Sequence, residues 1–445
     1  MDIKQNLEFS KKTGFILGFE DLGEFGSRPV PAKRVLVLMI RGIYSNWKLP
    51  VSYYYSENGV RAEVLGKIIK NNLNLLRQCG LKLLGVICDQ STTNQKLFKT
   101  LKVTAEAPYF FHDDNKYYAL FDTPHLLKSI RNNLLAGDFI LHGHVISWNF
   151  VKRLFYLDKE SHTARALPKI TDRQINPNNF QKMSVKLATQ IFSHSVAAAM
   201  KTTVQTKQLP DEALATANFI EDMDTLFDAM NSKFPHSKNA ANRPLSDNNI
   251  EVIESLNKGI NIMSNLQKIA VKHAQVDLLS PPCFSGIIQT INGIKVLHND
   301  NKAEAQPYIL TGRLNQDLFE NLFSKYRQRG GYNKNPTVRT FDALFKSNCV
   351  NNLLKAPDES NCEPDEDIPL FEQDVQTVDA NDSDIMSISS SASETSNPTE
   401  SLEECSVTYF SGYLANKLLE KFRCEHCKKK LLERKIYEIK ISYYY

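Results

Sequence analysis

The sequence has little of what marks membrane or secreted proteins. Its longest apolar runs, such as Val35–Ile40, fall far short of the roughly 18 residues that span a bilayer. The first residues lack the apolar core of a signal peptide. The chain has 8 cysteines in 445 residues, too few for a disulfide scaffold. We therefore expect no membrane association, and reduced thiols in the cytosol or nucleus.

Several motifs for nucleotide and hydrolase chemistry are also missing. The sequence contains no Gly-x-x-x-x-Gly-Lys-Ser/Thr phosphate loop, no Gly-x-Gly-x-x-Gly turn and no Gly-x-Ser-x-Gly elbow. Apolar residues make up 42% and charged residues 23% of the chain, as in ordinary globular proteins. This composition excludes a fibrous or wholly disordered protein. The length of the chain predicts two or three domains.

Basic residues are absent from one segment, and this absence changes the meaning of the net charge of +4. Residues 357–404 hold 15 Asp or Glu and no Lys or Arg, and they include a serine cluster. This composition predicts a disordered linker. The rest of the chain has 54 basic and 35 acidic residues, a net charge of +19. Such an excess favours a polyanionic partner, nucleic acid first, although a basic solvated surface would give the same count.

The N-terminal third has the pattern of an α/β domain. Strand-like runs at Gly14–Phe19, Arg34–Ile40 and Pro50–Tyr55 precede an amphipathic helix at Val60–Cys79. Leu81–Cys88 and Tyr117–Phe121 read as buried strands, and a helix is expected from Pro124 to about Leu135. Strands that alternate with helices in this way are joined by helical crossover connections, and they predict a mixed sheet with helices on its faces.

The middle of the chain changes to helical stretches. Met183–Met200 and Glu212–Met230 are the clearest helices of a mostly helical unit, and Leu314–Gln328 is a further helix before Gly330 and Gly331. The predicted divisions are residues 1–137, 138–307, 308–356, 357–404 and 405–445.

Two aspartates follow predicted strands. Asp89 follows Leu81–Cys88, where catalytic groups of α/β sheets collect and where a carboxylate could hold Mg²⁺; alternatively it caps the next helix. Asp122 follows Tyr117–Phe121 and is an N-cap candidate. His125, Lys128 and Arg131 lie at offsets of three on the following helix, so they form either a stripe suited to a phosphate backbone or a solvated face.

Two further groups could carry chemistry. Asp317 and Glu320 lie three apart on a predicted helix, followed by Arg327 and Arg329; such an acid pair is either a site or simply solvated. Cys424 and Cys427 form a Cys-x-x-Cys, which is half of a zinc site or two free thiols.

Taken together, five stretches resemble the P-element-type DNA transposases, whose relatives carry an N-terminal THAP zinc finger. They occur in the family's order, and the last two are the most specific. The stretches are GFEDLG (18–23), MIRGIYSNWKLPVSYYY (39–55), CDQSTTN (88–94), FDTPHLLKSIRNNLL (121–135) and LTGRLNQDLFENLFSKYRQRGGYNKNPTVRTF (310–341).

The resemblance implies a ribonuclease-H-like mixed sheet, interrupted by a mostly helical insertion that binds GTP in the P element. It also implies an Asp-Asp-Glu metal site for Mg²⁺. The second acidic ligand of that site matches Asp89, and the third matches Glu320. Asp317 is the accompanying acid, and Asp122 matches the Asp-x-Pro-His motif that supports the site. Lys128, Arg131, Arg327 and Arg329 would lie near the DNA backbone.

The implied function is Mg²⁺-dependent DNA cleavage and strand transfer in the nucleus, by a homo-oligomer acting on transposon ends and target DNA. The sequence departs from the family in two ways. It starts at the Met of the Asp-Glu-Met stretch that carries the first catalytic Asp, and it has no THAP finger. The alternative is therefore a catalytically inactive, domesticated or truncated remnant that binds DNA or protein.

Overall fold

A computed structural model describes residues 1–11, 14–45, 47–160, 165–272, 275–302, 307–329 and 335–350. The chain divides into two compact units, Met1–Leu370 and Phe371–Tyr445, and every described residue belongs to the first. The predictions for residues 357–404 and 405–445, including Cys424 and Cys427, lie outside the described residues.

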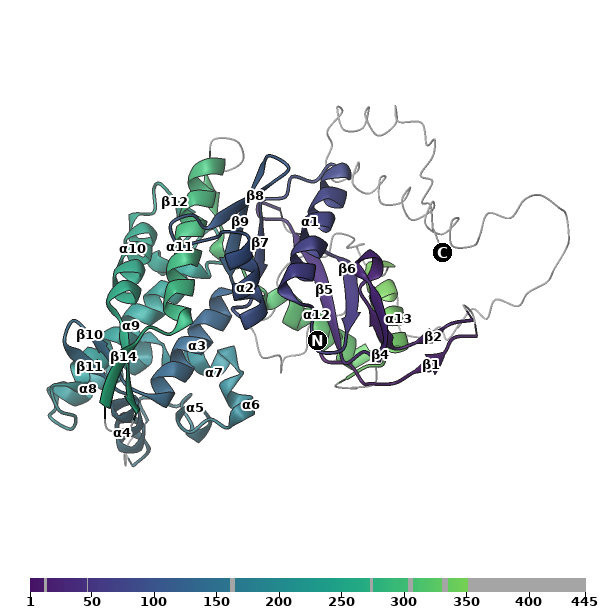
Figure 1. Cartoon of the computed structure of the whole chain (residues 1–445). Helices are drawn as coiled ribbons and strands as arrows, with labels where there is room; N and C mark the ends of the chain where they lie inside the picture. Colours follow the sequence, from purple (N-terminus) through teal and green to yellow (C-terminus); the bar gives the residue numbers. More distant parts are fainter. Residues whose placement is uncertain are drawn as a thin grey trace, which may run out of the picture. The chain divides into compact units, whose positions relative to one another are not determined.

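The first sheet is antiparallel and has the strand order β4-β3-β6-β5 (Figure 1). The predicted strands at 34–40 and 50–55 are confirmed as β5 and β6. The strand predicted at 14–19 is divided at Gly18, whose φ of +112° suits glycine. A short hairpin, β1 with β2, precedes the sheet. The strands are β1 (Glu8–Phe9), β2 (Ile16–Leu17), β3 (Phe19–Asp21), β4 (Ser27–Pro31), β5 (Arg34–Arg41) and β6 (Lys48–Ser56).

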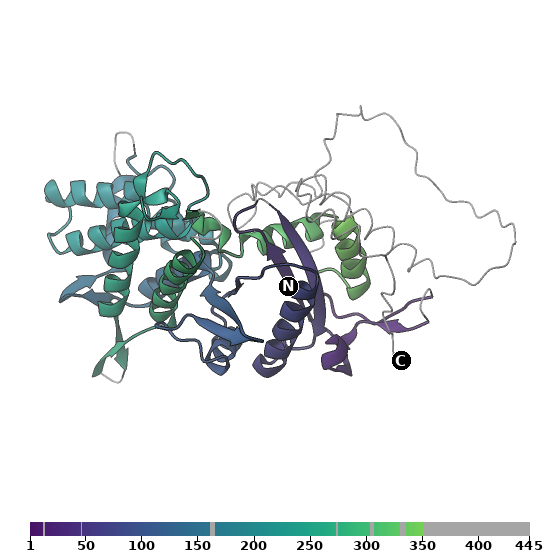
Figure 2. The same cartoon turned by 90° about the horizontal axis from the view of Figure 1, so that it is seen from above.

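Helices cover both faces of this sheet (Figure 2). Strand alternation sends Val35 and Val37 of β5 into a core with α12 (Asp317–Arg329) and α13 (Val338–Val350). Leu36 instead packs on the opposite face, which α1 (Ala62–Gln78) covers. The predicted helix at 60–79 is thereby confirmed. The helix predicted at 314–328 is confirmed as α12, which begins three residues later, at Asp317, and ends at Arg329.

The second sheet has the order β7-β9-β8, with β7 parallel to β9. Its elements are β7 (Gly85–Cys88), α2 (Thr92–Thr100), β8 (Tyr109–His112), β9 (Asn115–Phe121) and α3 (Thr123–Ala136). The parallel pair brings the ends of β7 and β9 to the same edge, so Asp89 and Asp122 follow neighbouring strands. Helix α11 (Pro282–Asn301) packs against β9, where Thr290 accepts a hydrogen bond from the Phe121 amide.

The insertion is mostly helical, as predicted, but it also contains strands. Its helices are α4 (Trp148–Lys159), α5 (Asp172–Ile175), α6 (Asn179–Lys182), α7 (Val185–Ile191), α8 (His194–Gln205), α9 (Ala213–Met230) and α10 (Ile250–Asn265). Its strands are β10 (Phe139–Leu141), β11 (His144–Ile146), β12 (Leu245–Ser246), β13 (Gln267–Lys272), β14 (Gln275–Leu279) and β15 (Tyr308–Ile309). Three short 3₁₀ turns complete the described elements: η1 (Gly23–Phe25), η2 (Ala240–Asn242) and η3 (Thr311–Arg313).

One helix prediction in the insertion is wrong. Met183–Met200 does not form a single helix, because α7 ends at Ile191 and α8 begins at His194. Ser193 has the extended φ of −139°, and the His194 amide donates to the Asp224 carboxylate of α9 at 2.9 Å. A tertiary contact with α9 therefore starts the second helix, which apolar periodicity could not show.

No helix in the described ranges is long and apolar enough to cross a bilayer.

Candidate active site

Asp89 lies directly after β7 and is half-buried. Its Oδ1 accepts hydrogen bonds from the Ser91 amide at 3.1 Å and from Asn94 Nδ2 at 2.7 Å. These bonds hold the start of α2, whose N-cap residue Ser91 makes no side-chain cap bond itself. Asp89 thus caps the next helix locally and also presents a carboxylate at a strand end. The contacts support the capping interpretation, and the interpretation of Asp89 as a metal ligand stays a prediction.

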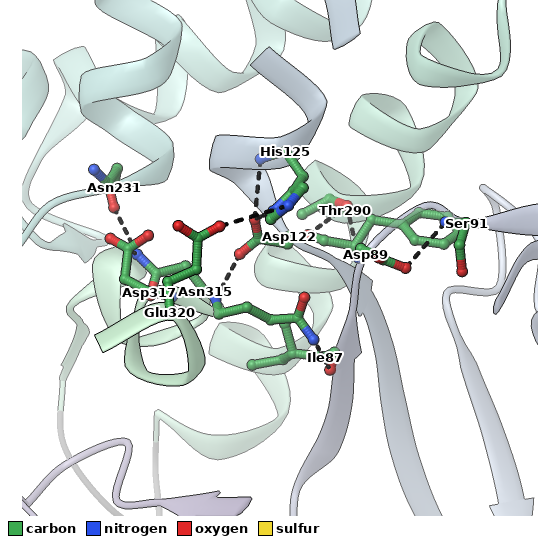
Figure 3. Close-up of polar contacts among 12 residues, drawn as sticks. Ile87, Asp89, Ser91, Asp122, His125, Asn231, Thr290, Asn315, Asp317 and Glu320 are labelled. Atoms are coloured by element: carbon green, nitrogen blue, oxygen red, sulfur yellow. Dashed lines mark hydrogen bonds and ion pairs between the residues drawn. The ribbon is translucent and has the colours of Figure 1, made fainter. Parts of the chain in front are cut away.

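Asp122 is the most enclosed acid of the site, with 1% of its surface exposed. It is the N-cap of α3, as predicted, and Oδ2 accepts from the His125 amide at 3.0 Å and contacts His125 Nδ1 at 2.6 Å. Its Oδ1 accepts from the Gln316 amide, just before α12 (Figure 3). A buried carboxylate needs such donors. Asp122 therefore holds both His125 and the start of α12 in place.

Helix α12 brings Glu320 to the same place. Leu322 and Tyr326 anchor this helix in the core beneath the first sheet. Glu320 remains about one-third exposed, and its Oε1 lies 3.8 Å from His125 Nε2. Asp122, His125 and Glu320 thus form a continuous chain of contacts across the site (Figure 3).

Asp317 is directed to a different neighbour. Its Oδ2 accepts from Asn315 Nδ2 at 3.2 Å and lies 4.0 Å from Lys233 Nζ, and Asn315 also bonds Asn231. The predicted pair on one helix is real, but Asp317 connects α12 to the insertion while Glu320 contacts His125. This geometry suits the supporting role predicted for Asp317.

The sequence interpretation missed the part that His125 plays. It placed His125 on a cationic stripe, whereas the side chain bridges two carboxylates. Burial lowers the pKa of His125, but the hydrogen bond and charge of Asp122 outweigh this, so the pKa is raised above its ordinary value. The Asp-x-x-His spacing across an N-cap was the signal that could have identified the pair.

Lys128 lies one helical turn beyond His125. Burial lowers the pKa of its ammonium group, and the charges of Glu320, Asp122 and Asp89 partly offset that effect. These three acids favour the charged form of Lys128, so the lysine is a cation of the same site.

Arg131 corrects the sequence interpretation. Its side chain is fully buried, and Nη2 donates to the Lys182 carbonyl at 3.0 Å. Burial lowers the pKa of Arg131 to about 10. The side chain ties α3 to the end of α6, so its prediction as a DNA-backbone contact is wrong. The offset of three gives the side of α3 on which Arg131 lies, and the segment Gln181–Lys182 covers the side chain there.

The two later arginines, Arg327 and Arg329, both belong to α12. Arg327 lies on α12 with an exposed side chain. Arg329 ends the same helix, and its side chain lies outside the described residues.

Asp89 and Glu320 are the candidate donors for a metal ion. The described part of the chain contains no group of three or more His, Cys, Asp and Glu that could hold one. Asp89 and Glu320 are nevertheless partly exposed carboxylates, and Mg²⁺ is commonly held by one or two carboxylates together with water and substrate phosphates. The chemistry of these two donors fits Mg²⁺ and does not suit a thiol-binding metal.

Comparison with family models gives three matches in chain order. The TNP-like RNase H N-terminal domain matches residues 1–102. The TNP-like GTP-binding insertion domain matches 124–244, and the TNP-like RNase H C-terminal domain matches 313–346. The α/β part that holds the two sheets is therefore ribonuclease-H-like, and an insertion domain interrupts it along the chain. These ranges do not fix the predicted boundaries at 137, 307 and 356, which stay predictions.

Two curated proteins and one solved structure are similar to the chain. The Transposable element P transposase of Drosophila melanogaster is 28% identical over 321 residues, covering 70% of this chain and 40% of that protein. The DNA transposase THAP9 of Homo sapiens is 24% identical over 368 residues, covering 78% and 39%. This chain thus spans about two fifths of the length of these relatives.

The solved structure is the Drosophila P element transposase strand transfer complex. It matches with a TM-score of 0.67 at 26% identity, and the match covers 79% of this chain and 75% of that chain.

Proposed function

Because the chain belongs to the P-element-type transposase family, we propose that it acts on DNA by Mg²⁺-dependent cleavage and strand transfer. The observation that carries this proposal is that Asp89 and Asp122 follow neighbouring parallel strands, and that Asp122, His125 and Glu320 contact one another in series. Asp89 and Glu320 would hold Mg²⁺, which supports phosphoryl transfer by activating the attacking oxygen and stabilising the leaving oxygen.

The protein's own residues prepare this site. Asp122 fixes the amide of Gln316 and the ring of His125, so it sets where α12 begins and where His125 points. His125 in turn faces Glu320. Lys128 supplies positive charge beside the acids and would lie near a phosphate of the DNA backbone. Arg327, exposed on α12, is the second candidate for such a contact.

Mg²⁺-dependent nicking of a labelled DNA duplex by the full chain tests the site. We expect Asp89→Asn and Glu320→Gln each to lower the rate by about 100-fold or more, as for loss of a charge-stabilising group. Glu63→Gln is the matched control, because Glu63 lies on α1 and pairs with Lys96. Equal rates in Glu320→Gln and the unchanged protein would refute the assignment. Binding to DNA without any nicking would instead favour the inactive remnant.

Binding to DNA can be tested separately from cleavage. We expect affinity to fall steeply with salt, because contacts to phosphates release counterions. Lys128→Gln should weaken binding and flatten the salt dependence, whereas Lys186→Gln, an exposed lysine on α7, should leave both unchanged. Fluorescence anisotropy with a labelled duplex measures both quantities. A DNA substrate also implies action in the nucleus.

The insertion carries a second proposed function, GTP binding, which rests on the family model that matches residues 124–244. Titration of the full chain with GTP, followed by calorimetry, tests it. No heat of binding at millimolar nucleotide would remove this part of the proposal. The active form is proposed to be a homo-oligomer, which mass measurement with and without DNA would test.

A further inference from the structure

Asp89 and Asp122 differ in how many of their carboxylate oxygens already accept hydrogen bonds. In Asp122, Oδ1 accepts from the Gln316 amide, while Oδ2 accepts from the His125 amide and contacts the ring of the same residue. Both oxygens of Asp122 are therefore occupied, and only 1% of the residue's surface is exposed. An acid bonded in this way has little capacity left for a cation.

Asp89 is bonded at one oxygen only. Among the described residues, the donors to its carboxylate are the Ser91 amide at 3.1 Å, drawn in Figure 3, and Asn94 Nδ2 at 2.7 Å. Both of these groups bond Oδ1. Because a carboxylate oxygen has two lone pairs, the two donors together fill Oδ1, and Oδ2 keeps both of its lone pairs. Asp89 can therefore offer a cation one oxygen but not two.

Asn94 is held in place for this contact by a second bond. It lies in the first turn of α2, and its Nδ2 also donates to the main-chain carbonyl of Asp89 at 3.1 Å. The amide group is thus tied to the main chain and to the side chain of the same residue. Since an amide is uncharged, it fixes the carboxylate without neutralising it. Asp89 consequently keeps its full negative charge for a cation.

The number of oxygens that a carboxylate can offer affects which divalent ion it suits. Mg²⁺ demands near-ideal octahedral geometry and is usually bound through one or two carboxylates, with water in the remaining positions. Ca²⁺ takes about six to eight oxygen ligands and accepts a carboxylate through one oxygen or through both. A carboxylate limited to one oxygen therefore supplies what Mg²⁺ needs and less than Ca²⁺ can use.

We propose that Asn94 is a positioning residue that sets the ion preference of the site. Together with the Ser91 amide it fills Oδ1 of Asp89, restricts that acid to binding an ion through Oδ2, and so favours Mg²⁺ over Ca²⁺. This role rests on the proposed function, because it takes Asp89 as a metal ligand. It adds to that function a residue outside the acids that decides which ion they hold.

Two substitutions test the role of the filled oxygen, because each removes a different donor. Asn94→Ala removes the side-chain donor. Ser91→Pro removes the main-chain N–H, and the φ of −62° at Ser91 already suits proline. Each change frees one lone pair of Oδ1, so both should act in the same direction. Gln95→Ala is the matched control on α2, because that side chain donates to the Gln90 carbonyl at 2.9 Å.

The measurement is the affinity of the full chain for Mg²⁺ and for Ca²⁺, each determined by calorimetry. We expect Asn94→Ala and Ser91→Pro each to raise the affinity for Ca²⁺ relative to Mg²⁺ by about tenfold, because Ca²⁺ gains a second oxygen from Asp89. Gln95→Ala should leave this ratio unchanged. A merely structural role of Asn94 would weaken the binding of both ions together, so it would not move the ratio. Urea denaturation identifies the variants that are folded.

Asp89→Asn, measured in the same way, separates the two possible failures. If Asp89→Asn loses both ions while Asn94→Ala keeps the original ratio, the role of Asn94 is overturned and the proposed function stands. The same holds if Gln95→Ala shifts the ratio as much as Asn94→Ala does. If Asp89→Asn binds both ions as well as the unchanged protein, Asp89 is not a ligand, and the role of Asn94 is overturned together with the proposed metal site.

Discussion

The two apolar cores of the described chain differ in size and in what they contribute to the site. The larger core runs from α1 through β7 and β9 into the helices of the insertion. The smaller core lies between the first sheet, α12 and α13. Asp89, Asp122 and His125 follow strands of the larger core, whereas Glu320 stands on a helix anchored in the smaller one. The candidate site is therefore assembled from both.

Directional polar contacts connect the two cores around the site. Gln316 donates its amide to Asp122 and its side chain to the Ile87 carbonyl, and Asn315 donates to Asn231. Arg41 and Arg313 add bonds to the Gly312 and Ile43 carbonyls. The comparison shows that apolar packing stabilises each half, while a few hydrogen bonds set the position of Glu320 relative to Asp122.

The largest expected effect follows from damage to the smaller core. Phe341 is fully buried and contacts the rings of Tyr53, Tyr55 and Tyr326. Phe341→Ala should cost about 3–5 kcal/mol of unfolding free energy. Segment-resolved hydrogen exchange should show faster exchange in β5 and α12, with β9 unchanged.

Phe139→Ala is the matched control in the larger core, because Phe139 is equally buried and packs on Phe219 and Phe284. It should accelerate exchange in β9 and α9 instead. If either substitution destabilised both cores to the same extent, the distinction between them would be wrong.

Asp122→Ala comes next, since it removes the acceptor shared by the two cores. The loss of the α3 cap and of the bond from the Gln316 amide should cost about 3 kcal/mol. Ser147→Ala is the control, because Ser147 caps α4 with a single bond and should cost about 1 kcal/mol. Urea denaturation measures both, and equal costs would show that the contact with Gln316 contributes nothing.

Arg131→Met should cost about 2 kcal/mol, because the carbonyls of Gln181 and Lys182 lose their buried donor. DNA affinity of the folded variant should be unchanged, since Arg131 is fully buried. Lys128→Gln should show the opposite pattern: its DNA affinity should fall, and its free energy of unfolding should change little. If the fully folded Arg131→Met variant lost DNA affinity, the prediction that Arg131 contacts the DNA backbone would be right after all.

The smallest effect concerns one side chain that connects the two cores. Gln316→Ala should cost about 1 kcal/mol through loss of the bond to the Ile87 carbonyl. Gln95→Ala removes a similar bond, to the Gln90 carbonyl at 2.9 Å, which stays within the segment that joins β7 to α2. Both should lower stability equally, but only Gln316→Ala should accelerate exchange at the start of α12. Equal exchange there in both variants would contradict the connecting role.

The sequence predicted those features that depend on local patterns. Asp122 as an N-cap, the strands at β5 and β6 and the acid pair on α12 all follow from short-range spacing. The outcome for Arg131 could not be predicted, because the offset of three gives a helix side without saying what covers it. The bridge from His125 to Glu320 joins residues 195 positions apart, and the break between α7 and α8 depends on Asp224 of another helix.

The most direct test of the account is a double-mutant cycle on Mg²⁺ affinity, measured by calorimetry on the full chain. If Asp89 and Glu320 hold one ion together, Asp89→Asn and Glu320→Gln should each weaken binding by about tenfold or more, and the double variant should lose little beyond either single one. Independent, additive losses, or no loss in either variant, would contradict a site assembled from the two cores.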